Sequence, residues 1–126
     1  VGSEMCIRDS HHEVCIISID VIRMGTDITL CIYGGKAHVG TCVMALPRPS
    51  LSGKGVSSTV SCLNRIGHLD DAFASVLAKA ISSRLNCVVV CSCGIHINNA
   101  TEAQIESLLH SVSDIVEVVL SHLKEE

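Results

Sequence analysis

Residues 13–33 read EVCIISIDVIRMGTDITLCIY, and this stretch decides the fold class. Two runs rich in valine and isoleucine, Glu13–Met24 and Asp27–Tyr33, flank Gly25-Thr26-Asp27. β-Branched runs are typical of strands, and glycine with aspartate between them is typical of a turn. The stretch therefore predicts two consecutive strands joined by a tight connection.

The strand pattern continues along the chain. After the turn signal Gly34-Gly35-Lys36, the run His38–Leu46 predicts a third strand, and we expect these three strands to form an antiparallel meander. Pro47–Ser50 and Gly53–Gly55 indicate a loop. The run Ser57–Leu63 then predicts a short fourth strand.

The C-terminal half combines two helices with one strand. Asp70 predicts the N-cap of a helix, and Asn86 suits the position just after its end. Cys87–Cys93 (CVVVCSC) is apolar on both faces, which favours the centre of a sheet. Thr101 and Gln104 form a capping-box pattern before a last helix. The apolar helical stripes are Phe73, Val76, Leu77, Ala80, Ile81 and Leu85, then Ile105, Leu108, Leu109, Val112, Val116, Val119, Leu120 and Leu123.

The expected element order is β-β-β-β-α-β-α. Strands come first and helices follow, which predicts an α+β domain: an antiparallel sheet of about five strands with two helices on one face. The length of 126 residues fits one domain. We expect residues 11–126 to form it.

The first ten residues, VGSEMCIRDS, are expected to lie outside the fold. They are what the DNA string GTG GGC TCG GAG ATG TGT ATA AGA GAC AG(C/T) encodes, which looks like a transposase-type sequencing adapter read in frame. We therefore predict that residues 1–10 are a translated adapter and disordered. A native disordered tail is the alternative.

Composition excludes several classes of function. The net charge is −4 and aromatic residues make up 2% of the chain, whereas single-strand nucleic-acid binders need a basic groove and stacking rings. No apolar run approaches the roughly 18 residues of a membrane helix, and no secretory signal pattern is visible. Of the eight cysteines, all but Cys6 sit in strand-like apolar runs, which favours reduced core thiols and a cytoplasmic protein.

Three histidines next to glycines mark the candidate site: His38, His68 and His96. Glycine lets the backbone approach a ligand closely, and strand-to-helix junctions present N–H groups to anions. Arg48 on a proline-flanked loop and the nearby Lys36 add positive charge. If these loops converge, their pocket would suit a phosphorylated small molecule.

Structural roles and a metal site remain open for the same residues. His38 could pack at a strand start, His68 could cover a helix N-terminus, and Asn98 could be a turn residue. Arg48 could be a solvated loop charge. Alternatively, His38, His68 and His96 could bind zinc in a small metalloenzyme.

Familiar catalytic motifs do not occur. The sequence has no HExxH, no CxxC, no GxSxG elbow and no phosphate-cradling GxxxxGK[ST]. Cys42 or Cys62 could act as a nucleophile with a histidine, but no local pattern marks either residue. Cys91 and Cys93 are interpreted as core residues. The sequence motifs therefore favour binding over catalysis.

Four strings in order carry a resemblance to a known family: residues 34–40 (GGKAHVG), 45–50 (ALPRPS), 67–71 (GHLDD) and 94–100 (GIHINNA). Together they resemble the LpdD-like family of prenylated flavin chaperones, which includes the small D subunit of gallate decarboxylase. The similarity extends from about Glu13 to Leu123.

The resemblance implies a non-catalytic protein that binds reduced prenylated FMN and delivers it to a UbiD-type decarboxylase of (hydroxy)aromatic acids. The cofactor would come from a UbiX-type prenyltransferase. The family is also similar in architecture to proteasome-assembling chaperones, which dimerise. The mean hydropathy of +0.46 leaves apolar surface that favours a homodimer. A structural assembly chaperone without a small ligand is a further alternative.

Within this resemblance, site roles follow from chemistry. Arg48, with Lys36 or Ser50, would bind the FMN phosphate. Because aromatic residues are scarce, the flavin ring would rest on aliphatic side chains and Met44.

The remaining candidates would line the polar edge of the same pocket. These are His38, His68 and His96, with Asn98 beside them, and no metal is expected in this interpretation. Asn98 stands where the family pattern suggests aspartate (HIN in place of HID), so no carboxylate role is carried over to it.

Overall fold

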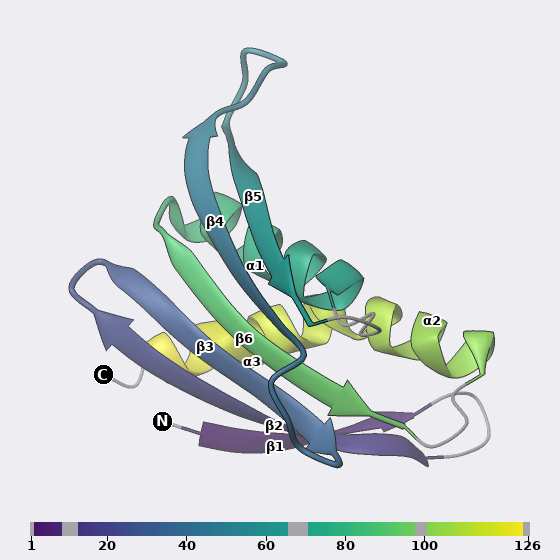
Figure 1. Cartoon of the computed structure of the whole chain (residues 1–126). Helices are drawn as coiled ribbons and strands as arrows, with labels where there is room; N and C mark the ends of the chain where they lie inside the picture. Colours follow the sequence, from purple (N-terminus) through teal and green to yellow (C-terminus); the bar gives the residue numbers. More distant parts are fainter. Residues whose placement is uncertain (1, 9–12, 66–70, 98–100, 125–126) are drawn as a thin grey trace.

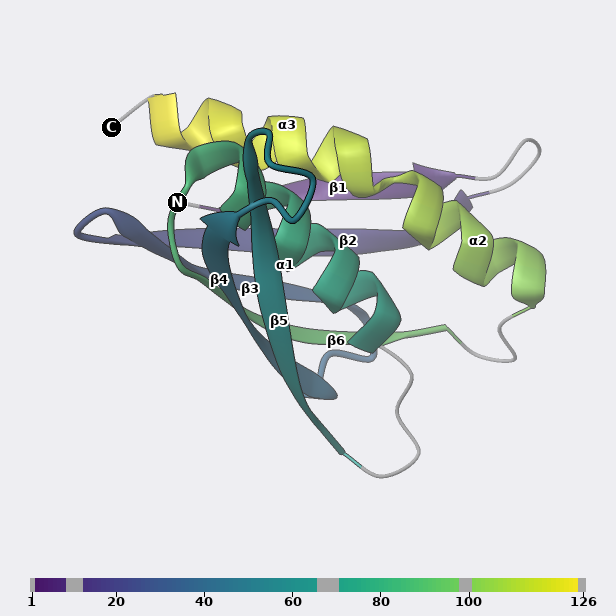
Figure 2. The ribbon, with the colours of Figure 1, turned by 90° about the horizontal axis from the view of Figure 1, so that it is seen from above.

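The strands of this protein form one sheet with all helices on one side of it (Figures 1 and 2). The structure is a computed structural model, and it describes residues 2–8, 13–65, 71–97 and 101–124. Within these residues the elements are β1 (Gly2–Arg8), β2 (Glu13–Met24), β3 (Asp27–Gly35), β4 (Thr41–Pro49), β5 (Val56–Asn64), α1 (Asp71–Leu85), β6 (Val89–His96), α2 (Glu102–His110) and α3 (Val112–Lys124).

The strand order across the sheet is β1-β2-β3-β6-β4-β5. All neighbours are antiparallel except β3 and β6, which run parallel. The α+β class is therefore confirmed, and so is the central position of the strand after α1. The expected three-stranded meander is wrong in its last strand, because β6 inserts between β3 and β4. In this position β6 pairs with β3 on one side and with β4 on the other.

The face of the sheet that carries the helices holds the core. Burial alternates along the strands, so every second residue of β3 is buried and its neighbours are only half-buried. Cys91 and Cys93 are 0% and 1% exposed, which confirms them as core residues. The core side chains from the strands are Ile17, Ile19, Val21, Ile28, Leu30, Ile32, Val43, Ala45 and Val89, and those from the helices include Phe73, Leu77, Ile81, Ile115 and Val119.

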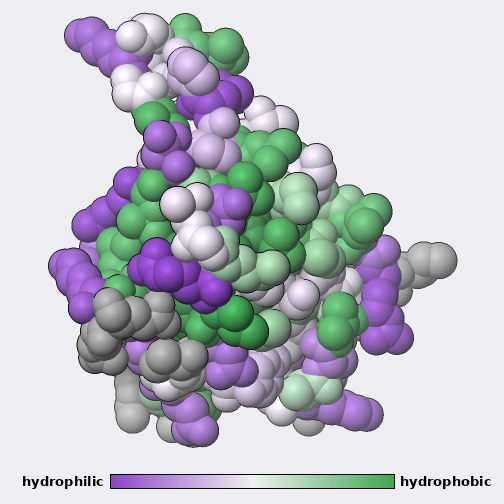
Figure 3. All heavy atoms as spheres, turned by 90° about the vertical axis from the view of Figure 1, so that its left-hand side faces the viewer, coloured by the Kyte–Doolittle hydropathy of each residue, from purple (hydrophilic) through white to green (hydrophobic). Residues whose placement is uncertain are grey.

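The opposite face, which we call the open face, is turned toward the viewer in Figure 1. The same alternation places several large apolar side chains on it. Examples are Ile16, Ile22, Met44, Leu46 and Leu63, with exposures from 44% to 79%. In the space-filling view, apolar (green) and hydrophilic (purple) patches lie side by side on the surface (Figure 3). This face has no covering layer in the described chain.

Residues 2–8 differ from the expected disorder, because they form β1. They pair antiparallel with β2, from Gly2 opposite Asp20 to Arg8 opposite Glu13. Met5 packs against the core and Ile7 is 1% exposed. Apolar residues at alternate positions give this peptide a strand pattern that the edge of β2 accepts. Its origin as a translated adapter stays a prediction.

The last helix was expected to be continuous, but it is divided at Ser111 into α2 and α3. The Ser111 hydroxyl donates to the Ser107 carbonyl at 2.7 Å, a bond that is typical of bent helices. The capping box is confirmed: Gln104 N donates to Thr101 Oγ1 at 3.2 Å, and Thr101 N donates to Gln104 Oε1 at 2.9 Å. The expected N-cap Asp70 lies outside the described residues.

The predicted end of the first helix is also confirmed, because Asn86 follows α1 with a φ of +51°. Of the helices in the described part of the chain, none has the length and apolar character needed to cross a membrane.

Candidate functional site

The parallel strands β3 and β6 end side by side, and we call the region at their carboxyl ends the β3–β6 edge. The two connections that follow these strands run in different directions. The last pair of this parallel ladder is Gly35 opposite His96. After β3 the chain passes over β6 to reach β4 on its far side, whereas after β6 it continues toward α2. Diverging connections at the carboxyl ends of parallel strands are a common place for ligand sites.

Close backbone contacts hold the 36–40 loop against β6. A Cβ at Gly94 would lie 1.5 Å from the His38 carbonyl oxygen, so only glycine allows this crossing. Gly40 N donates to the Cys93 carbonyl at 2.9 Å and fixes the loop beyond the crossing. The structure therefore brings His38 and His96 to the same edge, as the sequence predicted.

His38 is half-buried over Gly94, and its ring orientation is set by the loop itself. Its Nδ1 lies 2.9 Å from the Lys36 carbonyl oxygen. A carbonyl only accepts, so Nδ1 carries the proton, and in the neutral ring Nε2 is the acceptor. His96 and Lys36 are exposed at the same edge.

Two further side chains at this edge were not predicted from the sequence. The Arg65 backbone N donates to the Gly40 carbonyl at 2.9 Å, and Nη1 donates to the Val39 carbonyl at 3.2 Å. Arg65 lies two residues before the first glycine of GHLDD, so a search for cations near the glycine-histidine strings would have found it.

Tyr33 is the other residue that was missed. It lies opposite Gly94 in the ladder, on the open face beside the crossing. Its hydroxyl donates to Asp20 Oδ2 at 3.1 Å. This hydrogen bond, and then the charge of Asp20, raises the pKa of Tyr33, so the side chain stays a neutral phenol.

Arg48 and Ser50 lie at the other end of the sheet. Thr41, at the start of β4, is level with Cys93, and Arg48 follows seven residues later, which is about 20 Å along a strand. Arg48 Nε donates to Thr59 Oγ1 at 2.9 Å, and Ser50 Oγ lies 2.9 Å from Ser52 Oγ in the β4–β5 turn. The structure thus does not place Arg48 or Ser50 with Lys36 and the histidines.

His68 and Asn98, the other two candidates, lie outside the described residues. The metal hypothesis needs His38, His68 and His96 together. Because His68 lies outside the described residues, the structure does not show how the three are arranged. Among the residues that the structure does describe, no group of three or more His, Cys, Asp or Glu side chains is placed to hold a metal ion.

The model of the prenylated flavin chaperone LpdD-like domain matches residues 11–124 of this chain. The chain belongs to that family. The match begins after the ten-residue segment that contains β1, and it includes the whole β3–β6 edge. A comparison with curated proteins gave no significant match.

A solved structure with a similar fold is a chain from the crystal structure of a chaperone complex for yeast 20S proteasome assembly. The similarity covers 99% of this LpdD-like chain and 95% of the other, with a TM-score of 0.52 and 14% sequence identity. At this identity the likeness concerns the fold alone. It confirms the expected architecture.

The cysteines of this LpdD-like protein differ in burial. Burial, together with the neighbouring Cys31 and Cys42, raises the pKa of Cys91 to about 12, so it remains a thiol. Cys62 is exposed, with its Sγ 3.0 Å from Ser75 Oγ. Cys42 is half-buried.

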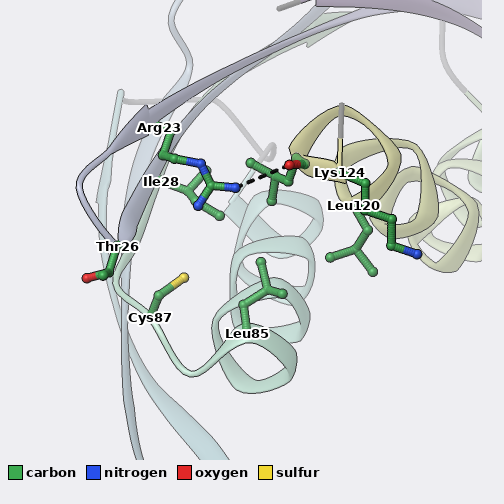
Figure 4. Close-up of a pocket in the computed structure, with 8 residues that line it drawn as sticks. Arg23, Thr26, Ile28, Leu85, Cys87, Leu120 and Lys124 are labelled. Atoms are coloured by element: carbon green, nitrogen blue, oxygen red, sulfur yellow. Dashed lines mark hydrogen bonds between the residues drawn. The ribbon is translucent and has the colours of Figure 1, made fainter. Parts of the chain in front are cut away.

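A cavity of about 300 Å³ lies at the β2–β3 turn, away from all predicted site residues. Figure 4 shows Arg23 at one side of it and Leu85 and Cys87 at the other. Arg23 Nη2 donates to the Leu123 carbonyl at 3.4 Å, at the end of α3. Cations stabilise helix C-termini, so this contact gives Arg23 a structural role in the fold.

Proposed function

We propose that this LpdD-like protein binds prenylated FMN without turning it over and delivers the reduced cofactor to a UbiD-type decarboxylase. The observation that carries the proposal is the family match over residues 11–124. The bound group would supply its chemistry only in the decarboxylase, so the residues of this chain need only hold, shield and release it.

The β3–β6 edge has the donors that the phosphate end of such a ligand needs. Lys36 is exposed in the crossing loop, and Arg65 is attached to the same loop through Val39 and Gly40. A guanidinium has five N–H donors, and one of them is engaged by the Val39 carbonyl. We therefore assign phosphate binding to Lys36 and Arg65, in place of Arg48 and Ser50.

The polar edge of a flavin ring carries both N–H donors and carbonyl acceptors. A histidine ring can donate and accept hydrogen bonds, so the exposed His96 suits such an edge, whereas His38 Nε2 is buried and His38 shapes the crossing loop through its Nδ1 contact with the Lys36 carbonyl. Tyr33 adds an aromatic side chain that Asp20 holds in place. Met44 lies beside Val90 of β6, and Val90 is six residues before His96. Met44 is therefore about 20 Å from His96 along the strand. Tyr33 is thus the better candidate for contact with the flavin ring.

The setting that fits this function is a reducing one. Cys31, Cys42, Cys62, Cys87 and Cys91 are free thiols in the structure. Free thiols persist in the cytoplasm, where a UbiX-type prenyltransferase would supply the reduced cofactor. We therefore place the protein in that compartment.

We further propose that the protein is a homodimer that packs through the open face. Ile22, Thr29, Val90 and Met44 form one row across four neighbouring strands. A two-fold axis parallel to the strands, between β3 and β6, would place Ile22 of one copy against Met44 of the other. Six strands spaced about 4.8 Å apart give a face of several hundred Å² per copy, close to the roughly 800 Å² of a stable interface.

The experiment that tests the function is an anaerobic transfer assay. The protein is loaded with reduced prenylated FMN, freed of unbound ligand and mixed with an apo form of a UbiD-type decarboxylase. We expect flavin absorbance to leave the protein and decarboxylase activity to appear, without any decarboxylation by the loaded protein alone. Retention of one metal ion per chain with no flavin would contradict the proposal and favour the metalloenzyme alternative.

A further inference from the structure

Charge is unevenly distributed along this acidic chain. The net charge is −4, yet residues 28–69 contain no aspartate or glutamate and four cations: Lys36, Arg48, Lys54 and Arg65. Lys36 and Arg65 lie at the β3–β6 edge, where the flavin is proposed to bind. Arg48 and Lys54 lie at the opposite end of the sheet, where the proposed function gives them no role.

Arg48 and Lys54 belong to a projecting hairpin, which we call the arm and define as residues 46–59. β4 pairs with β5 along its whole length, from Thr41 to Pro49, but it pairs with β6 only from Thr41 to Ala45. Beyond Ala45 the two strands therefore continue alone. Figure 1 shows them rising above the rest of the sheet, and Figure 3 shows the tip standing clear of the body.

Prolines keep the β4 edge of the arm, beyond the end of its pairing with β6, from pairing with another strand. Pro47 and Pro49 occupy alternate positions of β4 just where the pairing with β6 stops. Proline has no N–H to donate, so it is tolerated only on the edge of a sheet and blocks strand addition there. At the β4 edge a partner would therefore contact side chains, because strand addition is blocked there.

Buried hydroxyl groups brace the base of the arm. Ser58 Oγ donates to Ser82 Oγ of α1 at 2.9 Å, and both residues are at most 3% exposed. Ser82 Oγ in turn donates to the Cys87 carbonyl at 2.7 Å. The base is therefore fixed to the core.

The tip is also ordered by its own hydrogen bonds. Ser50 N donates to the Gly55 carbonyl and Gly53 N donates to the Ser50 carbonyl, each at 3.0 Å. Gly53 and Gly55 supply the positive φ angles, +80° and +73°, that this turn requires. A preordered loop loses little entropy on binding, so the tip is suited to recognition.

What the tip presents is one apolar side chain between two cations. Leu51 is 92% exposed at the apex, the highest value among the exposed large apolar residues. Arg48 and Lys54 lie on either side of it in the hairpin. This combination suits an acidic protein surface with a shallow apolar pocket.

We propose that the arm docks on another protein, with Leu51 inserted in an apolar pocket and Arg48 and Lys54 against acidic side chains. The inference rests on the proposed function in one respect, because it identifies that protein as the apo-decarboxylase that receives the flavin. The arm would hold the receiving enzyme, while the β3–β6 edge, at the far end of the sheet, stays available for the flavin.

A membrane surface fits the arm less well. Interfacial membrane anchors use tryptophan and tyrosine, and anionic lipids are recognised by clusters of about 4–8 cations. The arm has no aromatic residue and two cations. A protein partner is therefore favoured by both its apolar and its charged side chains.

The test measures binding of the immobilised, cognate apo-decarboxylase to the full chain at low and high salt. We expect Leu51→Asp and Lys54→Glu each to weaken binding about tenfold or more, and added salt to weaken the wild type. Lys79→Glu is the matched control, because it makes the same charge change at an exposed position of α1 outside the arm. It should bind like the wild type.

Equal binding by all four proteins, or no binding by the wild type, would overturn the proposal. Binding of the wild type to phosphatidylserine vesicles, lost in Leu51→Asp, together with no binding to the enzyme, would assign the arm to membranes. Retention of prenylated FMN is measured on the same samples. If the wild type does not retain flavin, the proposed function is rejected. If Leu51→Asp retains flavin and binds the enzyme like the wild type, only the proposal that the arm docks on the enzyme is rejected.

Discussion

At the scale of single residues, the sequence predicted part of the arrangement of the candidate site. His38, His96 and Lys36 were predicted because glycines beside histidines at element ends are a local pattern, and the structure brings these three to one edge. Arg48 was placed with them because nothing in the local sequence says at which end of the sheet a loop lies. Arg65 has a local signal, because it lies close to GHLDD, but its contact with residues 39 and 40 is long-range and cannot be inferred from that signal.

Gly94→Ala should displace the 36–40 loop, because Gly94 lies in β6 directly beneath it. The new methyl would meet the His38 carbonyl, so the crossing loop must move, and we expect flavin retention to fall. Gly25→Ala is the control: its φ is +63° with no atom within 4 Å, so it costs only the roughly 1–2 kcal/mol of a left-handed residue. Urea unfolding and flavin retention of both variants check this. A Gly94→Ala protein that holds flavin normally would contradict the account of the crossing.

Ser82→Ala should destabilise the fold by about 1–3 kcal/mol. The change removes a hydroxyl that is 0% exposed and that bonds to the Cys87 carbonyl and to Ser58, which leaves buried polar groups unsatisfied. Ser83→Ala, at a half-buried neighbour that also contacts Ser58, should cost less. Equilibrium urea unfolding measures both changes, and equal costs would argue against the buried network.

Cys91 should make stability fall at alkaline pH. Its pKa is raised from 9.0 to about 12 in the folded protein, so the unfolded chain loses this proton first. The stabilisation is therefore complete below about pH 9 and is lost as the pH rises toward 12. We expect the urea midpoint to drop less between pH 8 and 10.5 in Cys91→Ala than in the wild type. Parallel declines in the two proteins would show that Cys91 does not contribute.

At the scale of elements, the positions of strands and helices followed from periodicity, but their neighbours in space did not. The run Cys87–Cys93 is apolar on both faces, and that alone predicted a central strand. The connection over Gly94 and helix α1 determine which two strands β6 separates. Neither can be predicted from the periodicity of apolar residues. The division of the last helix at Ser111 was missed because the apolar stripe continues through it.

The start of α2 gives a prediction at this scale. Thr101 and Gln104 satisfy each other's backbone N–H groups in a capping box. Thr101→Ala should therefore destabilise the protein by about 1 kcal/mol, with a larger effect on hydrogen exchange in α2 than in α1. Thr101→Ser keeps the hydroxyl and should restore most of the loss. If the serine variant is as unstable as the alanine variant, the cap is not the cause.

At the scale of the whole molecule, the open face predicts self-association. Met44 is 45% exposed on this face, so Met44→Glu should leave the fold intact and shift the protein from dimer to monomer. Leu51→Asp, on the arm, should leave the dimer unchanged. Sedimentation velocity at micromolar concentration distinguishes these states. A monomeric wild type, or a dimeric Met44→Glu variant, would show that the open face is not the contact.

The central claim is that prenylated FMN binds at the β3–β6 edge, and flavin retention tests it most directly. The wild type, His96→Ala and Arg48→Ala are each incubated anaerobically with reduced prenylated FMN, freed of unbound ligand and measured for bound flavin. We predict about one flavin per wild-type chain, little in His96→Ala and wild-type retention in Arg48→Ala. Loss of flavin in Arg48→Ala with full retention in His96→Ala would place the ligand at the other end of the sheet and contradict the account.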